Sequence, residues 1–317
     1  MNTQTNKHIP VMINQAVNFL PQKENLNIID ATFGGGGYSK LLLMNKNINN
    51  LIAIDRDPLA KIYAKKLENK TNFKFIEGQF SKIDQLVSEQ MNKKNFKGFD
   101  AIFFDLGMSS NQIEDKKRGF SFQINSPLDM RMSGKGFSAY DLINNFSEIE
   151  IANIFFKYGQ EKYSKSIAKK IVENRKKNNI QTTEDLIKII KNSIKLKTKK
   201  HPATKVFQAL RIYVNNELHE ISEALNKSEK LLIPGGRIIV VSFHSLEDKL
   251  VKEYFNHKSG KKWRSSRHNP EPSDTGQITL KIITKKAIKP DNIEIASNPR
   301  CRSARLRVAE KIMESSL

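Results

Sequence analysis

Cysteine is almost absent from this 317-residue chain, in which Cys301 is the single example. A lone cysteine excludes an internal disulfide and a cysteine-rich zinc site. No stretch approaches the roughly 18 apolar residues of a membrane span, and residues 1–15 contain no apolar core of a signal peptide. We therefore expect a cytoplasmic protein without a membrane partner. No metal site is expected either, because no ligand spacing connects the histidines at positions 201, 219, 244, 257 and 268.

Acidic residues are scarce relative to basic ones. The chain contains 54 Lys and Arg against 33 Asp and Glu, which gives a formal net charge of +21. Such a charge indicates a polyanionic partner, and nucleic acid is the first interpretation; charge that serves solubility alone is the other. With 38% hydrophobic and 27% charged residues, the composition is that of a globular protein of one large or two ordinary domains.

Strand and helix signals alternate over the first hundred residues. Apolar runs predict strands, and amphipathic segments predict helices at 38–44 and from Pro58 to about residue 70. The four predicted strands are 26–29, 51–54, 73–76 and 101–104, and three of them are followed directly by an aspartate: Asp30, Asp55 and Asp105. Repeated β-α-β units predict an α/β fold with a parallel, doubly wound sheet, whose ligands bind beyond the carboxyl ends of the strands.

Helical signals replace this alternation from Ser147 onward. Ser147 and Glu150 form a predicted capping box, and Gly159 is the predicted end of that helix. Further helices are expected at about 161–177, 183–194 and 203–227. Residues 157–200 contain 14 Lys and Arg against 4 Asp and Glu. We predict an all-helical, basic insertion at 131–210, which is either a solvated surface or an RNA-facing lobe.

Strand signals return after the insertion. Pro234, Gly235 and Gly236 predict a turn into a strand at 238–242, and a last strand at 278–283 is expected to pair antiparallel beside it. Two basic segments follow the insertion, a loop at 258–267 that contains Trp263 and a tail at 298–307. Both are expected to contact phosphates if the partner is RNA.

The stretch DATFGGGGYSK places four glycines, Gly34 to Gly37, between a predicted strand and a predicted helix. A P-loop is excluded because the required lysine is missing, and a dinucleotide fingerprint would need its third glycine at Ser39. An S-adenosylmethionine site needs only a close backbone approach, with Asp55 accepting the ribose hydroxyls, although Asp55 suits a dinucleotide equally well. A plain tight turn is the remaining alternative. The Pro-Gly-Gly turn and the antiparallel last strand favour the seven-stranded methyltransferase sheet.

Several further motifs point the same way. They are DLGMSSNQI at 105–113, RGFSF at 118–122, PLDMRM at 127–132, HIPV at 8–11, DRDP at 55–58, HPATKVFQALR at 201–211, SFHSLED at 242–248 and NPRCRS at 298–303. In this order and spacing they resemble the ribosomal RNA small subunit methyltransferase H family, also called MraW. That family methylates N4 of a cytosine in the decoding region of 16S rRNA.

The resemblance implies a Rossmann-like class I methyltransferase with a seven-stranded, mostly parallel sheet. The S-adenosylmethionine-dependent methyltransferase domain would comprise residues 1–130 and 211–317, with the helical insertion at 131–210. The implied partner is 16S rRNA within the small ribosomal subunit, in rRNA processing, and a homodimer is possible. The implied cofactor contacts are Gly36, Gly37, Tyr38, Asp55, Phe80, Asp105 and Gln112.

The sequence departs from the family pattern at a few positions. Tyr38 stands where the family usually has histidine, Asn111 where it has proline, and Asn125 and Ser126 where it has Asp-Gly; Ser133 replaces an acid. A backbone contact at Tyr38 would tolerate the change, whereas a role that needs an imidazole would not.

For catalysis, the candidates are Asp105, Ser109 and His244. We expect Asp105 mainly on the cofactor side and Ser109 or backbone carbonyls nearer the amine, while His244 contacts the base or removes its proton. A helix cap is the alternative for Asp105 and His244, and a turn for Ser109. Candidate substrate contacts are Asp129, Arg131, Lys205, Arg211, Trp263, Arg300 and Arg302, with a structural ion pair as the alternative for Asp129 and Arg131. Two other functions remain open, an NAD-dependent oxidoreductase and a non-catalytic basic rRNA-binding protein.

Overall fold

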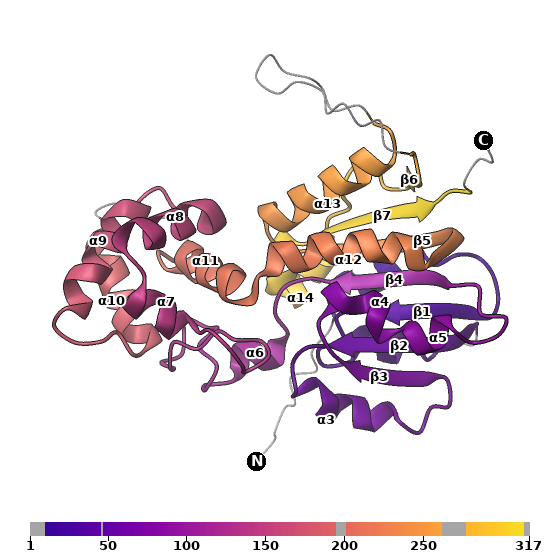
Figure 1. Cartoon of the computed structure of the whole chain (residues 1–317), viewed down its shortest axis with the longest axis horizontal. Helices are drawn as coiled ribbons and strands as arrows, with labels where there is room; N and C mark the ends of the chain where they lie inside the picture. Colours follow the sequence, from indigo (N-terminus) through magenta and orange to yellow (C-terminus); the bar gives the residue numbers. More distant parts are fainter. Residues whose placement is uncertain (1–9, 46, 195–200, 262–276, 314–317) are drawn as a thin grey trace. The chain divides into compact units, whose positions relative to one another are not determined.

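The computed structural model describes residues 10–45, 47–194, 201–261 and 277–313 (Figure 1). The chain forms two compact units, one of residues 1–107 and 218–317 and the other of residues 108–217. No helix within the described ranges is long and apolar enough to cross a membrane.

The first unit is built on one seven-stranded sheet with the order β3-β2-β1-β4-β5-β7-β6. All neighbouring strands are parallel except β7, which is antiparallel to both β5 and β6. This arrangement confirms the α/β, Rossmann-like class I methyltransferase fold. The strands are β1 (Leu26–Asp30), β2 (Ile48–Asp55), β3 (Phe73–Glu77), β4 (Phe99–Asp105), β5 (Leu232–Ser242), β6 (Leu280–Ile282) and β7 (Arg305–Lys311).

Both faces of the sheet are covered, which explains why β1, β2 and β4 read as nearly continuous apolar runs. One face packs against α4 (Ile83–Leu86), α5 (Ser88–Met91), α12 (Glu217–Leu231) and α13 (Ser245–Lys258). The other packs against α1 (Ile13–Val17), α2 (Gly37–Leu42) and α14 (Asn292–Ser297). Helix α3 (Ala60–Ala64) packs beside β2. The described residues of the unit also form the 3-10 helices η1 (Lys65–Leu67), η2 (Phe80–Lys82) and η3 (Pro299–Ser303).

The end of the sheet differs from the sequence-based expectation. The tail predicted at 298–307 runs into strand β7, which lies between β5 and β6. The prediction that the segment 278–283 pairs beside 238–242 was therefore wrong: its strand, β6, pairs with β7, and β7 is the antiparallel neighbour of β5. In β7 the buried Leu306 and Val308 alternate with Arg305 and Arg307. The charges of these arginines masked a strand periodicity that is present in the sequence.

The Pro-Gly-Gly segment also differs from its prediction. It lies inside β5 as a bulge, because Leu232 pairs with Phe99 but Arg237 pairs with Ala101, and Gly235 has a φ of 80°. A bulge of this kind inserts extra residues on one strand without ending the strand.

The second unit is helical and has its own core. Its helices are α6 (Ser110–Glu114), α7 (Ala139–Asn145), α8 (Glu148–Gly159), α9 (Ser164–Arg175), α10 (Thr183–Ser193) and α11 (Thr204–Asn215). The capping box predicted at Ser147 and Glu150 is present. Helix α8 is capped by Gln160 in the left-handed region rather than by Gly159. Gly159 is needed for packing, since a Cβ there would lie 2.4 Å from the carbonyl oxygen of Lys205.

The borders of this unit lie outside the insertion predicted at 131–210. Residues before 131 belong to it because Phe120, Leu128 and Met130 pack into its core. At the other border, the helix predicted at 203–227 is broken into α11 and α12 by Asn216, which has a φ of 51°.

Candidate active site

The first unit gathers three aspartates at one edge of its sheet. Asp30, Asp55 and Asp105 end β1, β2 and β4, which are parallel neighbours, so all three carboxyl groups lie at the carboxyl edge. This is the edge at which open α/β sheets bind their ligands.

Asp30 is almost completely buried and holds the chain around the glycine turn. Its Oδ2 accepts a hydrogen bond from the Ser39 hydroxyl at 2.7 Å, and its Oδ1 accepts one from the Thr32 N–H at 3.3 Å. Burial raises the pKa of Asp30 from 3.8 to about 6, and these hydrogen bonds oppose that rise. Asp30 therefore joins the end of β1 to the start of α2.

Asp55 ends β2 with each carboxylate oxygen accepting one backbone hydrogen bond. Oδ2 accepts from the Gly34 N–H at 2.6 Å and Oδ1 from the Asp57 N–H at 2.8 Å. Burial raises the pKa of Asp55 to about 6, with smaller contributions from the charges of Asp57 and Asp30. A carboxylate oxygen can accept two hydrogen bonds, so Asp55 keeps capacity for the hydroxyl groups of a ligand.

Asp105 has an oxygen without a partner. Its backbone N–H donates to Thr32 Oγ1 at 2.7 Å, but within the described part of the chain its buried Oδ1 accepts no hydrogen bond. Burial raises the pKa of Asp105 well above its usual range, and the charges of Asp30 and Glu247 raise it further. An unsatisfied buried acceptor is expensive to maintain, so this atom is a candidate ligand contact.

The glycine turn is explained largely by contacts within the chain. Gly36 has a φ of 77°, and a Cβ there would lie 2.7 Å from the Phe33 ring. Gly37 has no positive φ, but a Cβ would lie 2.1 Å from Cγ of Pro10. The tight-turn interpretation thus accounts for both glycines, and their role as backbone contacts for a cofactor stays a prediction.

Two aromatic residues predicted at the cofactor site pack in the cores of the unit. The Tyr38 side chain is buried, its hydroxyl donates to the Val11 carbonyl at 2.6 Å, and its ring lies 5.9 Å from that of Phe103. Tyr38 can therefore reach a ligand only through its backbone. Phe80 is half-buried at the start of η2, with its ring at a steep angle to Phe104 and 5.8 Å from it.

His244 caps helix α13, which was the alternative to its catalytic role. Its Nδ1 accepts the Glu247 N–H at 3.3 Å, while Glu247 Oε2 accepts the N–H groups of Phe243 at 2.7 Å and His244 at 3.2 Å. The basic nitrogen of the neutral imidazole is thus used by the cap.

In the helical unit, Ser109 and Gln112 cap the start of α6. Ser109 Oγ accepts the Gln112 N–H at 3.3 Å, and Gln112 Oε1 accepts the Ser109 N–H at 3.1 Å. This capping box gives both side chains a structural role in the described structure.

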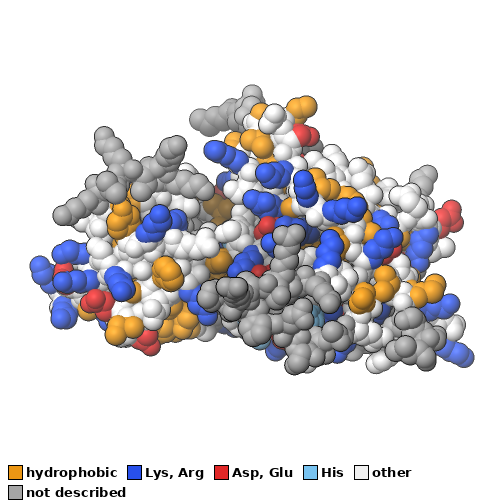
Figure 2. All heavy atoms as spheres, turned by 90° about the horizontal axis from the view of Figure 1, so that it is seen from above, with side chains coloured by type: hydrophobic (Ala, Val, Ile, Leu, Met, Phe, Trp, Pro, Cys, Tyr) orange, Lys and Arg blue, Asp and Glu red, His pale blue; other side chains and the backbone are white. Residues whose placement is uncertain are grey.

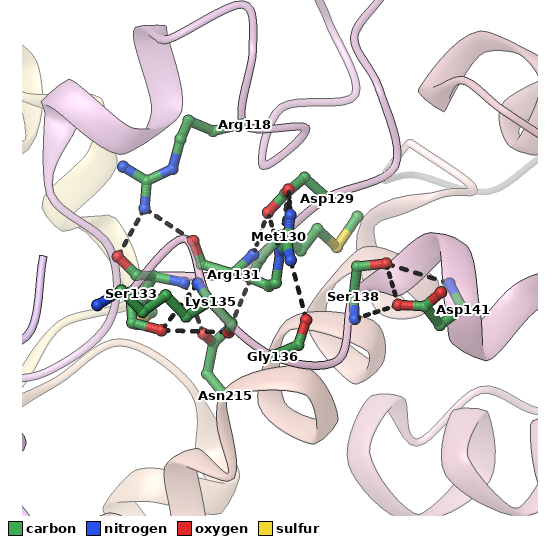
Figure 3. A network of polar contacts seen from close by, with 11 residues as sticks. Arg118, Asp129, Met130, Arg131, Ser133, Lys135, Gly136, Ser138, Asp141 and Asn215 are labelled. Carbon is green, nitrogen blue, oxygen red and sulfur yellow. Dashed lines mark hydrogen bonds and ion pairs between the residues drawn. The ribbon is translucent and has the colours of Figure 1, made fainter.

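Asp129 and Arg131 form the structural ion pair that the sequence left as one of two options (Figure 3). Arg131 Nη2 lies 2.5 Å from Asp129 Oδ2, Nε contacts both oxygens at 3.1 Å, and Nη1 donates to the Gly136 carbonyl at 2.9 Å. Between them, Met130 is buried with a φ of 58°, a strained conformation for a side chain of its size.

Asn215 and Arg118, neither of which was predicted as a site residue, hold this strained turn in place (Figure 3). Asn215 Oδ1 accepts the Met132 N–H at 2.8 Å, and its Nδ2 donates to the Met130 carbonyl at 2.7 Å. Arg118 Nη2 donates to the carbonyls of Arg131 at 2.8 Å and Met132 at 2.7 Å. Arg118 stood in a recognised motif, but no sequence signal marks Asn215, which is 85 residues from Met130.

The remaining predicted substrate contacts have different surroundings. Arg211 is buried and paired with Glu217 through two contacts of 2.7 Å, so the expectation that it binds RNA is not supported: its charge is balanced inside the protein. Lys205 is in an exposed contact with the Gln160 carbonyl at 2.8 Å. Arg300 and Arg302 are exposed on η3, and Trp263 lies outside the described residues.

Comparison with known proteins matches residues 5–312 to the MraW methylase family. A protein of Rickettsia canadensis named ribosomal RNA small subunit methyltransferase H is 44% identical over 311 residues, covering 97% of this chain and 98% of the relative. A Rickettsia bellii protein of the same name is 45% identical over 307 residues, covering 96% and 99%. The solved structure of an rRNA methylase from Streptococcus thermophilus is similar with a TM-score of 0.41 at 11% identity, covering 95% and 94%. The chain belongs to the MraW methylase family.

Proposed function

We propose that this protein transfers a methyl group from S-adenosylmethionine to N4 of a cytosine in the decoding region of 16S rRNA, in the small ribosomal subunit. The observation that carries the proposal is the gathering of Asp30, Asp55 and Asp105 around a glycine turn, in a chain of the MraW methylase family. Relatives at 40–45% identity are named ribosomal RNA small subunit methyltransferase H. With rRNA as substrate, the reaction belongs in the cytoplasm.

The residues at this edge fit S-adenosylmethionine. The cofactor carries a positive sulfonium and an ammonium group, which suit an edge with three carboxyl groups. Asp55 would accept the ribose hydroxyls with its remaining lone pairs, and the ring of Phe80 would lie against the adenine. The backbone at Gly36, Gly37 and Tyr38 would contact the amino-acid end. When bound, the cofactor supplies an electrophilic methyl group.

We assign to Asp105 the contact with the cytosine N4 amine that receives the methyl group. The lone pair of a cytosine N4 amine is delocalised into the ring, so a hydrogen-bond acceptor on its N–H groups would restore nucleophilicity. Oδ1 of Asp105 is a buried acceptor with no partner among the described residues. Its raised pKa makes the ionised carboxylate a stronger base than an exposed one, so it is suited to take the proton that the amine loses.

Ser109, Gln112 and His244 receive positioning roles in this scheme. Each uses its side-chain acceptor to cap a helix. His244 could act as a base only if Nδ1 gave up its bond to the Glu247 N–H. Proton removal is therefore assigned to Asp105, and the two caps fix the segments that follow β4 and β5.

The test is methyl transfer from radiolabelled S-adenosylmethionine to small ribosomal subunits from cells that lack this modification. We expect label at N4 of a decoding-region cytosine. Asp55→Ala should abolish both transfer and stabilisation by S-adenosylhomocysteine, whereas Asp105→Asn should lower the rate at least about 100-fold with less effect on cofactor binding. Asp84→Asn, an acid of the same unit paired with Lys227, is the matched control.

The outcomes separate the candidate functions. Cofactor binding without label in subunits or free 16S rRNA would indicate a methyltransferase with another substrate. RNA binding without cofactor binding would indicate a non-catalytic rRNA-binding protein and would overturn the proposal.

A further inference from the structure

A small basic pocket lies apart from the three aspartates, between α13 and the β6–β7 end of the sheet. Its volume is about 240 Å³. In Figure 2, Lys and Arg side chains are spread among hydrophobic and other atoms over the face seen from above, the side on which α13 lies in Figure 1. The polar lining consists of four cations and two neutral groups, Lys252, Lys261, Lys285, Arg307, Asn256 and Thr284, and no described acidic residue lines the pocket.

The positive charge of the pocket comes from its lysines. Arg307 is neutralised by Asp248, with Nε 2.7 Å from Oδ1 and Nη2 3.1 Å from Oδ2. In the part of the chain that the structure describes, Lys252, Lys261 and Lys285 are exposed and have no ion-pair partner. Three unbalanced ammonium groups around one cavity repel one another, and a bound anion would relieve that repulsion.

The backbone that positions these groups is held by hydrogen bonds. The Lys261 N–H donates to the Asn256 carbonyl at 3.1 Å, and the Thr279 N–H donates to the Lys258 carbonyl at 3.0 Å, which joins the end of α13 to the start of β6. Thr284 Oγ1 accepts the Val308 N–H at 2.9 Å, so its hydroxyl proton is available to donate. The pocket therefore has a fixed floor, and only the lysine chains must be ordered by a ligand.

The size and chemistry of the pocket select the ligand. Sites for drug-sized molecules occupy roughly 300–1,000 Å³ and are mostly apolar, whereas this one is smaller and strongly basic. A backbone phosphate group, whose two non-bridging oxygens share one negative charge and accept from ammonium and hydroxyl donors, suits it better than a base or a cofactor.

We propose that the pocket formed by Lys252, Lys261 and Lys285 with Thr284 binds a backbone phosphate of the RNA substrate. This inference rests on the proposed function, because it places a phosphate of the same RNA on the methyltransferase unit. The phosphate fixes the position of the strand and carries no sequence information, which is the usual division of roles between phosphate and base contacts.

The test compares two triple variants of the full chain. Lys252→Gln, Lys261→Gln and Lys285→Gln together remove the pocket charges. Lys93→Gln, Lys94→Gln and Lys97→Gln remove three exposed lysines between α5 and β4, so the change in net charge is identical. Binding of a single-stranded RNA fragment of the decoding region is measured by fluorescence anisotropy against salt concentration, and stabilisation by S-adenosylhomocysteine is measured for each protein.

We expect the pocket variant to bind RNA about tenfold more weakly at low salt. Its slope of log affinity against log salt should be smaller by about 0.7 for each phosphate released. The control should keep the wild-type slope, and all three proteins should be stabilised equally by S-adenosylhomocysteine.

Equal effects of the two variants on RNA binding would show a general electrostatic field and overturn the phosphate site. Millimolar inorganic phosphate could also stabilise the wild type and not the pocket variant while RNA binding is the same in both. That outcome would identify a free anion as the ligand and would also overturn the backbone-phosphate site. Absence of S-adenosylhomocysteine binding by the wild type would instead contradict the proposed function.

Discussion

The side chain of Asp30 is buried at the edge of the sheet where the strands end, and burial opposes its ionisation. Asp30 therefore lowers the stability of the folded protein at neutral pH. Its pKa is about 6 in the folded protein and 3.8 in the absence of burial. Between these values the unfolded chain has already released the proton that the folded chain retains, so stability falls as pH rises from about 4 to 6 and the loss is complete above that range. The cost to the folded state at neutral pH is about 3 kcal/mol.

Asp30→Asn should therefore stabilise the ligand-free protein at pH 7.5. The gain is about 2 kcal/mol, since roughly 1 kcal/mol is lost from the weakened hydrogen bond with Ser39. The difference between variant and wild type should shrink as pH falls toward 4. Urea unfolding at several pH values measures it, and a gain that is independent of pH would contradict this account of Asp30.

Tyr38 ties α2 to the N-terminal segment through its side-chain hydroxyl. Tyr38→Phe removes the hydrogen bond to the Val11 carbonyl and leaves that carbonyl unsatisfied. We expect a loss of about 1–3 kcal/mol in the free energy of unfolding. Affinity for S-adenosylhomocysteine, measured by calorimetry, should stay within about twofold because the backbone is unchanged. A large loss of affinity at unchanged stability would show that the hydroxyl acts on the ligand.

At the scale of elements, the turn from Asp129 to Met132 is held by side chains from distant parts of the helical unit. Asn215→Ala removes bonds to Met130, Met132 and the Arg211 carbonyl. The substitution should lower the free energy of unfolding by about 3 kcal/mol and speed amide exchange at residues 130–133. Asn216→Gly is the matched control, because Asn216 has a φ of 51° that glycine adopts readily. Unchanged exchange in Asn215→Ala would show that Arg118 and the Asp129–Arg131 pair suffice.

The glycine turn allows the two explanations of Gly37 to be separated. Gly37→Ala would place its Cβ against Pro10, and such overpacking costs about 1–3 kcal/mol. Pro10→Ala removes the clashing ring atoms, so the double variant should recover most of the loss, with a coupling energy of about 1 kcal/mol or more. Binding of S-adenosylhomocysteine is the second readout. If the double variant is stable but does not bind, the ligand itself requires the glycine.

The elements differ in how much of them the sequence could predict. Strands β1, β2 and β4 and their terminal aspartates follow from apolar runs of a length that suits buried parallel strands, whereas β3, in which no residue is fully buried, was predicted from the shorter Phe-Lys-Phe-Ile segment. Strand β7 was missed because Arg305 and Arg307 interrupt its apolar residues, and the pairing of both arginines with Asp248, which allows them in the strand, cannot be read from the local sequence. The break at Asn216 carries no Gly or Pro signal. Asn215 acts through hydrogen bonds with Met132 and Met130, which lie 83 and 85 positions earlier in the chain, so no local sequence pattern marks it.

Across the whole molecule, which has a net charge of +21, arginines and lysines have different surroundings. Several arginines are used inside the units: Arg131 with Asp129, Arg211 with Glu217, Arg237 with Glu310 and Arg307 with Asp248. The pocket lysines, in contrast, are exposed without an ion pair in the described ranges. Lysine is a flexible point charge that suits phosphate contacts, whereas the planar guanidinium suits two-point pairing with a carboxylate.

The two units have separate hydrophobic cores, and this predicts separate responses to the cofactor. One core lies entirely within residues 108–217, and the others lie within the sheet unit. A ligand stabilises only the structure that must be intact for it to bind, by about 2.7 kcal/mol at 100 times its dissociation constant. If the cofactor binds at Asp55 and Asp105, S-adenosylhomocysteine should slow amide exchange in β4 by up to about 100-fold. Amide exchange in α8 to α10 should stay unchanged. Hydrogen exchange with mass spectrometry resolves both regions. Asp55→Ala should remove the protection of β4, and equal protection of both units would show that they unfold as one.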